Sequence, residues 1–346
     1  MSTHALLAQL QAGVTDGIFP GATLAWQTDN DATLHQLAVG RHTYAVDAPV
    51  VTTDTIYDQA SLTKIVTATA AMCLLSARHI RIDDEVRRFL PQSHAHGVTI
   101  AHLLTHTSGL DIRLAAVAHH GAAELWRQVY ALTPQVPPGT TVAYANVNTL
   151  LLGEIVAHVT GWSLAEALRV LVLQPVDMTM TCFNPPLAWQ AHIPPTEHHA
   201  TRGVVHGVVH DESCAALGGV AGHAGLFGTA ADMVRFGRGW LATLAGDSPW
   251  QIHAADAQQA LVNHSPPAQL GCGWGWMLHR AQFMGVAAPE MAAHTGFTGP
   301  VVAIVPRQGL AWALMSNRTW PERRMPPQHH GVTLRVSECL WHAHAR

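Results

Sequence analysis

Strand-like segments stand at both ends of this chain and helical segments fill the middle, an order that restricts the topologies open to it. Near the N-terminus, segments 22–27 and 33–39 are separated by the turn-forming residues 28–31, which predicts a hairpin. The last third holds four short apolar segments, separated by turn residues: 273–278, 292–297, 301–305 and 311–315. Turn-forming residues 306–309 predict that the last two form a second hairpin.

Apolar spacing and capping residues predict helices between and around these strands. The predicted helices are 3–13, 61–76, 83–90, 99–106, 122–132, 146–159, one that begins at Ser163, 229–244 and 331–344, and residues 182–228 have the composition of loops. We therefore expect an α/β (α+β) fold, an antiparallel sheet flanked by the N- and C-terminal helices. Residues 1–77 and 229–346 form this mixed domain, residues 78–228 form an inserted helical domain, and a site lies between them.

Composition excludes several classes of function. Only 12% of residues are charged and 48% are hydrophobic, whereas soluble chains carry about 25% charged residues. Such a chain can bury a large core. A net charge of −4 and the lack of a basic cluster argue against a nucleic-acid partner or a membrane-surface partner. The N-terminus lacks the basic and apolar regions of a signal peptide, which predicts a cytoplasmic protein, or an exported one whose leader is missing from this sequence. The five scattered cysteines form no C-x-x-C pair, so they predict buried thiols rather than disulfides.

Lysine occurs once in the chain, at Lys64, whereas arginine occurs eighteen times. A lysine can lose its proton when it is desolvated, whereas an arginine keeps its charge, so the one lysine suggests a chemical role. The alternative is an arginine-rich bias that happened to spare one exposed lysine.

Ser61 stands three residues before Lys64, at the start of a predicted helix, so both side chains lie on one face. A serine hydroxyl needs a nearby base to become a nucleophile, and a buried lysine with a lowered pKa can be that base. The backbone N–H groups of a helix start can also stabilise an oxyanion. With 11 serines in 346 residues, the chance of this spacing by coincidence is about 3%.

Two further segments carry polar groups of possible use in the same chemistry. Tyr144 and Asn146 precede or begin the predicted helix 146–159, where a tyrosine can relay a proton if a nearby cation lowers its pKa; the alternative is a simple helix cap. His294, Thr295 and Gly296 lie on the predicted strand 292–297, where a glycine permits close approach of a ligand.

Taken together, S-x-x-K, Y-x-N and H-T-G in this order resemble the serine β-lactamase and penicillin-binding DD-peptidase family, in particular its class C-like branch with the β-lactamase-related esterases. The resemblance covers about residues 15–340. It also includes Tyr57-Asp58-Gln59-Ala60, Leu103-Leu104-Thr105-His106-Thr107-Ser108-Gly109-Leu110, Pro138-Gly139-Thr140 and Gly219-Val220-Ala221-Gly222-His223-Ala224-Gly225-Leu226-Phe227.

This resemblance implies a role for each motif residue. Ser61 corresponds to the nucleophile, and Lys64 and Tyr144 share the roles of base and proton relay, without an indication of which one takes the serine proton. Asn146 corresponds to the amide that positions the substrate. The backbone N–H groups of Ser61 and Phe297 correspond to the oxyanion hole.

The strand motif departs from most β-lactamases, which have lysine where this chain has His294. His294 and Thr295 correspond to residues that bind a substrate carboxylate or support the tyrosine. The histidine form resembles DD-peptidases, D-aminopeptidases and some esterases. The resemblance thus implies a serine hydrolase with an acyl-enzyme on Ser61. Its partner is a small acyl substrate, a D-amino-acid peptide or amide, a small ester or, weakly, a β-lactam, and no cofactor or metal is required.

Two alternatives come from other classes of function. The chain can be a catalytically silent binding module that kept the fold. It can also be a metal-dependent hydrolase, because imidazoles beside carboxylates bind zinc. The residues for such a site are His192, His198, His199, His206, His210, Asp211 and Glu212. His106 and His223 can line a cleft or serve the structure, and Trp274 and Trp276, on one face of a predicted strand, indicate core rather than a stacking platform.

Overall fold

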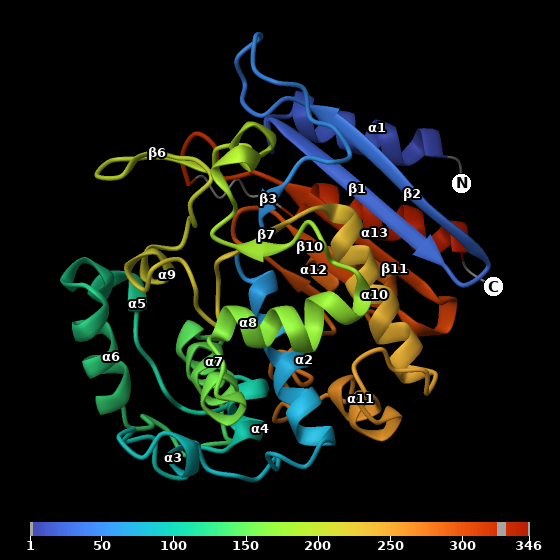
Figure 1. Cartoon of the computed structure of the whole chain (residues 1–346). Coiled ribbons are helices and arrows are strands. Elements are labelled where there is room, and N and C mark those ends of the chain that lie inside the picture. Colours follow the sequence, from blue (N-terminus) through green and yellow to red (C-terminus); the bar gives the residue numbers. More distant parts are fainter. Residues whose placement is uncertain (1–2, 324–329, 345–346) are drawn as a thin grey trace.

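Six strands from the two ends of the chain form the main sheet of the computed structural model, which describes residues 3–323 and 330–344 (Figure 1). Every pairing in this sheet is antiparallel. The strand order is β2 (Asp31–Gly40), β1 (Gly21–Thr28), β11 (Leu310–Ser316), β10 (Val301–Val305), β9 (Ala292–Thr295) and β8 (Met277–Leu278). Both predicted hairpins are present, so the N-terminal strands sit beside the last strand of the chain.

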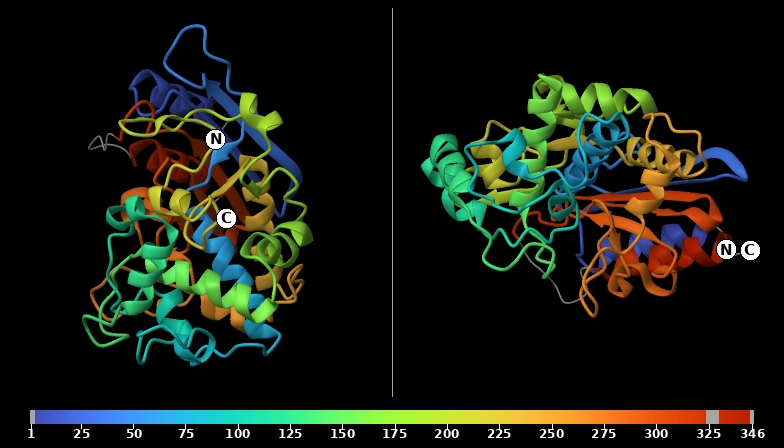
Figure 2. Two further views of the ribbon diagram at one scale, coloured as in Figure 1. Left: turned by 60° about the vertical axis from the view of Figure 1, so that its left-hand side comes forward. Right: turned by 90° about the horizontal axis from the view of Figure 1, so that it is seen from below.

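The two faces of the sheet bury different side chains because successive residues of a strand point to opposite sides. On one face, Leu24 and Trp312 pack in a core with α1 (Thr3–Thr15), α12 (Ala281–Met284) and α13 (Gly331–His344). On the other, Ala311 and Ala313 face α10 (Ala230–Leu244), which approaches closely because Gly237 has no side chain. Helices α1 and α13, the first and last helices of the chain, lie side by side (Figure 2).

Helix α2 (Leu62–Ser76) crosses the interior, with nearly every residue buried, as its mostly apolar sequence predicts. The same core includes residues of the middle segment. The other helices are α3 (Val86–Phe89), α4 (Ile100–Leu104), α5 (Leu114–Val117), α6 (Ala122–Ala131), α7 (Asn146–Thr160), α8 (Leu164–Leu168), α9 (Glu212–Ala216) and α11 (Ala254–Ala260). The division into an inserted and a split domain stays a prediction.

Several short elements differ from the predictions. Residues 182–228, expected to be loops, contain α9 and the strands β4 (Cys182–Phe183), β5 (Glu197–His199), β6 (Gly203–Val205) and β7 (Leu226–Gly228). Strand β7 pairs with β3 (Tyr57–Asp58) and β4 in a second sheet, and β5 pairs with β6. The predicted strand 273–278 is wrong for residues 273–276. Only its last two residues, which form β8 (Met277–Leu278), pair with β9. Trp274 and Trp276 are nevertheless buried, as expected for core residues.

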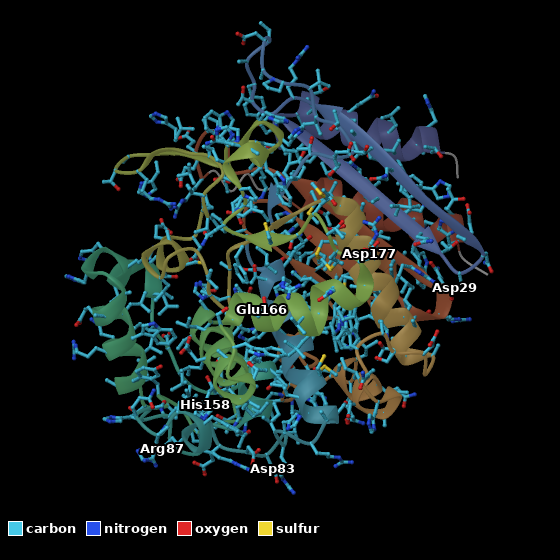
Figure 3. All side chains as sticks on the ribbon, in the orientation of Figure 1. Asp29, Asp83, Arg87, His158, Glu166 and Asp177 are labelled. Atoms are coloured by element: carbon cyan, nitrogen blue, oxygen red, sulfur yellow. The ribbon has the colours of Figure 1, made fainter. Side chains whose placement is uncertain are left out.

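Charged side chains such as Asp83 and Arg87 lie on the outside of the helical part (Figure 3). No single helix in residues 3–323 and 330–344 is both long and apolar enough to cross a membrane. Two helical segments, Asn146–Thr160 and Leu164–Val176, are together long and apolar enough for such a span, but a bend of 84° separates them.

Candidate active site

The residue before α2 is Ser61, and the first turn of this helix carries Lys64 toward it. The Lys64 Nζ atom lies 2.9 Å from Ser61 Oγ and donates a second hydrogen bond of 2.9 Å to the carbonyl oxygen of His223. Ala60 adopts a left-handed conformation with φ +46°, and its N–H is held by Asp58 Oδ1 at 2.8 Å. The structure therefore brings the S-x-x-K serine and lysine into direct contact.

Burial governs the charge of Lys64, which is only 1% exposed. Desolvation lowers the pKa of its amine from 10.5 to about 7, although the negative charge of Asp211 and the nearby Cys214 oppose this shift. A large fraction of the amine is thus unprotonated near neutral pH, and an unprotonated amine can accept the proton of the Ser61 hydroxyl.

Tyr144 reaches the same place from the loop before α7. The N–H of Ala143 donates to the carbonyl of His106 at 2.9 Å, and the rings of Tyr144 and His106 pack with centroids 4.6 Å apart. Lys64 Nζ lies 5.2 Å from the Tyr144 ring centroid. Of the two roles that the sequence allows for His106, lining the cleft or serving the structure, this contact favours the second, because the ring supports Tyr144.

The phenol of Tyr144 stays protonated at neutral pH. The residue as a whole is 46% exposed at the rim of the cleft. Desolvation raises the pKa of Tyr144 well above 10, and a hydrogen bond with Ser61 opposes the shift only in part. The lowering that would make Tyr144 a ready base is absent, because burial and the negative charge of Asp211 both raise its pKa.

Phe297 is the last residue of the predicted strand 292–297, but the structure ends β9 at Thr295 and places Phe297 in the turn that follows. Thr298 Oγ1 donates to the carbonyl of Asp58 at 2.8 Å, and a Cβ on Gly296 would come within 2.8 Å of the Gln59 carbonyl oxygen. This turn is therefore fixed against the loop that carries Ser61.

The backbone N–H groups of Ser61 and Phe297 are available at the resulting cleft. Neither donates a hydrogen bond to another residue in the described ranges. Both residues line one cavity of about 380 Å³, together with Tyr144, Asn146 and Thr295. Two unpaired donors at one cavity are what an oxyanion hole requires.

His294 is buried in β9 with its ring centroid 6.1 Å from that of Tyr144. Desolvation lowers the pKa of His294 to about 3, and the positive charges of Lys64 and His106 act in the same direction. A neutral imidazole cannot attract a substrate carboxylate as the lysine of most β-lactamases would. Of the two roles implied for this position, the geometry favours support of the tyrosine.

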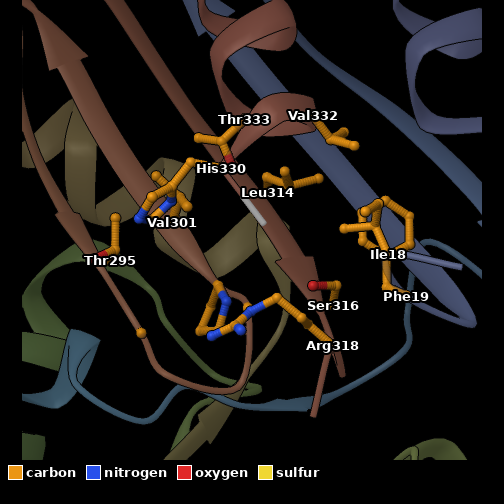
Figure 4. Close-up of a pocket in the computed structure, with 13 residues that line it drawn as sticks. Ile18, Phe19, Thr295, Val301, Leu314, Ser316, Arg318, His330, Val332 and Thr333 are labelled. Atoms are coloured by element: carbon orange, nitrogen blue, oxygen red, sulfur yellow. The ribbon is translucent and has the colours of Figure 1, made fainter. Parts of the chain in front are cut away.

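Four charged residues of the cavity had no place in the motif assignment: Asp211, Glu212, Arg318 and Arg323. The Asn146 amide lies 3.4 Å from Asp211 Oδ2. Arg318 follows β11, its guanidinium carbon is 5.5 Å from the Phe297 ring centroid, and it donates to the Phe297 carbonyl. Figure 4 shows Arg318 beside Ser316 in a smaller neighbouring pocket, whose lining also includes Thr295. Arg318 reaches the cavity because it follows β11 in the main sheet, and a short sequence motif does not show this order of strands.

The histidine-rich segment does not assemble a metal site within the described residues, where no group of three or more His, Cys, Asp or Glu side chains is placed to hold an ion. His206 Nε2 lies 2.7 Å from the Ile193 carbonyl oxygen, and His210 Nε2 lies 3.1 Å from Glu197 Oε2. These imidazoles thus connect parts of the loop to one another, against the metal-hydrolase alternative.

Comparison with known proteins agrees with the geometry. The sequence model of the Beta-lactamase family matches residues 6–335. A protein of Escherichia coli O157:H7 whose name proposes a D-alanyl-D-alanine carboxypeptidase is 30% identical, over 88% of this chain and 79% of its own length.

Solved structures show the same fold. An octameric penicillin-binding protein homologue from Pyrococcus abyssi has a TM-score of 0.78 at 20% identity, covering 98% of this chain and 78% of that one. EstCE1, described as a hydrolase with promiscuous acyltransferase activity, has a TM-score of 0.74 at 19% identity, covering 96% and 98%. The chain belongs to the β-lactamase family, a family of hydrolases.

Proposed function

We propose that this protein is a serine hydrolase that forms an acyl-enzyme on Ser61. The observation that carries the proposal is the 2.9 Å contact between Ser61 Oγ and the buried amine of Lys64. Because burial lowers the pKa of Lys64 to about 7, the amine can take the serine proton at neutral pH. Lys64 rather than Tyr144 is then the base.

In the acylation step, Ser61 Oγ forms a bond to the substrate carbonyl carbon while its proton passes to Lys64 Nζ. The carbonyl oxygen becomes an oxyanion that accepts hydrogen bonds from the N–H groups of Ser61 and Phe297. As the bond to the leaving group breaks, the Tyr144 phenol donates its proton to the departing nitrogen or oxygen, and Lys64 returns a proton to Tyr144. Water then attacks the ester carbon while Lys64 takes its proton, the bond to Ser61 Oγ breaks, and Lys64 returns the proton to the serine as the acid leaves.

A substrate with a free carboxylate on its leaving group fits the cavity best. The carboxypeptidase name of the Escherichia coli relative points to such a substrate. His294 is neutral here, so a cation must come from another residue, and Arg318 lines the cavity beside Phe297. Arginine binds carboxylates through two parallel N–H donors. We infer that the substrates are D-amino-acid peptides or amides, with small esters as secondary substrates, as the esterase neighbour suggests.

The proposal is tested by exposing the protein to a fluorescent penicillin and to a chromogenic short-chain ester, and mapping the adduct by mass spectrometry. We expect an adduct on Ser61 and its loss in Ser61→Ala. Ser163→Ala is the matched control, because Ser163 is an exposed helix cap on α8. If no acylating probe labels Ser61, the proposal is wrong, and unchanged turnover in Ser61→Ala would favour the silent binding module.

A further inference from the structure

Asp211 holds one carboxylate oxygen against the protein and leaves the other at the cavity. Oδ1 accepts hydrogen bonds from Ser213 Oγ at 2.5 Å and from the Cys214 N–H at 2.8 Å, and His223 Nε2 lies 3.2 Å away. Within residues 3–323 and 330–344, the one hydrogen-bond contact of Oδ2 is the long 3.4 Å contact with the Asn146 amide. The side chain is 24% exposed, so a ligand in the cavity can reach Oδ2.

The carboxylate is also fixed close to the nucleophile. Asp58 accepts the N–H of Ala60 on Oδ1 at 2.8 Å and the N–H of His210 on Oδ2 at 2.7 Å. One buried side chain thus joins the residue before Ser61 to the residue before Asp211. The negative charge of Asp211 acts on both Lys64 and Tyr144, raising the pKa of each.

Asp211 is an anion without a permanent cation beside it. Burial alone would raise the pKa of Asp211, but His223 and the hydrogen bonds to Oδ1 hold it well below its usual range. Within the described residues no arginine or lysine pairs with Asp211, and its partner His223 carries charge only when protonated. The neighbouring Glu212 differs, because it is paired with Arg323.

We propose that Asp211 determines specificity by receiving a protonated amino group on the acyl part of the substrate. This inference rests on the proposed function and narrows its substrates to aminoacyl compounds with a free amino group. Asp211 and Asn146 come from the helical wall, whereas Arg318 and Phe297 come from the end of the sheet. A short peptide with a free amino end and a free carboxylate complements both walls, and about 380 Å³ accommodates a small molecule of this kind.

The test compares D-alanyl-p-nitroanilide with its N-acetyl form, which lacks the charge. The wild type should favour the free amine, and Asp211→Asn should lower kcat/KM for it by at least about 30-fold, mainly through KM. The same variant should change the acetylated substrate by less than about threefold, because that substrate has no positive charge for Asp211 to receive. Any effect through Lys64 is common to both substrates and cancels in the ratio of their kcat/KM values. Glu212→Gln is the matched control, and it should leave the preference between the two substrates unchanged.

A second measurement needs only the wild type. D-alaninamide and N-acetyl-D-alaninamide are compared as competitive inhibitors of p-nitrophenyl butyrate hydrolysis. The free amine should inhibit at least about 30-fold more tightly, and the difference should vanish once pH exceeds the amine's own pKa.

Equal inhibition by the two amides, or an equal loss on both anilides in Asp211→Asn, would overturn the inference. Ser61 would still be acylated by esters in that case. Absence of any Ser61 adduct would instead refute the proposed function itself.

Discussion

Replacing Lys64 with methionine should change how the stability of the protein depends on pH. The amine has a pKa of about 7 when folded, against 10.5 in an unfolded chain. Below pH 7 both states carry the proton, and burial of the charge destabilises the fold in full. Above pH 10.5 neither state carries it, and this penalty is gone. Between these limits the unfolded state binds more protons, so wild-type stability rises with pH.

The size of this effect follows from about 1.4 kcal/mol for each pH unit within that window. From pH 7 to pH 9, wild type should gain about 2 to 3 kcal/mol of unfolding free energy relative to Lys64→Met. Lost hydrogen bonds to Ser61 and His223 shift the difference at every pH without changing its slope.

Urea unfolding of both proteins at half-unit steps from pH 6 to pH 9 measures this slope, since other titrating groups cancel in the difference. Lys64→Arg is the matched control, because arginine does not titrate in this range, and the wild type should show the same slope against it. A difference that stays constant across the range would refute the lowered pKa of Lys64.

Three further predictions concern turnover. Lys64→Arg keeps the charge and loses the removable proton, so stopped-flow acylation by a chromogenic ester should slow by orders of magnitude; near-normal rates would mean that Lys64 serves only as a charge. Gly296→Ala places a Cβ 2.8 Å from the Gln59 carbonyl oxygen and displaces Phe297. The loss of one oxyanion donor should lower kcat about 10²- to 10³-fold, and an unchanged kcat would show that the turn is not needed. Arg318→Gln should raise KM for anilides whose leaving group carries a carboxylate and leave uncharged esters unaffected; a parallel rise for both would place Arg318 outside substrate recognition.

Long elements and compact motifs could be predicted from the sequence because their signals are local. Helix α2 follows from a long, mostly apolar segment, and α10 begins after Thr229, whose side chain accepts the Asp232 N–H as a cap should. The contact between Ser61 and Lys64 follows from helical spacing alone. The family resemblance was confirmed by the comparisons.

The remaining features depend on contacts between distant segments. Strands β3, β4 and β7 have two or three residues each and exist only through pairing with one another, so no periodicity marks them. The sequence places Asp211 next to loop histidines and so suggests a metal ligand. Its position at the cavity depends instead on Asp58, which binds the N–H of His210, and on Asn146, and both lie far away in the sequence. The pKa of Tyr144 could not be predicted either, since it depends on how deeply the hydroxyl is enclosed.

The pH dependence of Ser61 acylation tests the central claim most directly. The single-turnover rate with an uncharged chromogenic ester should rise about tenfold per unit below pH 7 and level off above it, following the amine of Lys64. A midpoint near 10, or a rate that does not change with pH, would contradict an unprotonated Lys64 as the base.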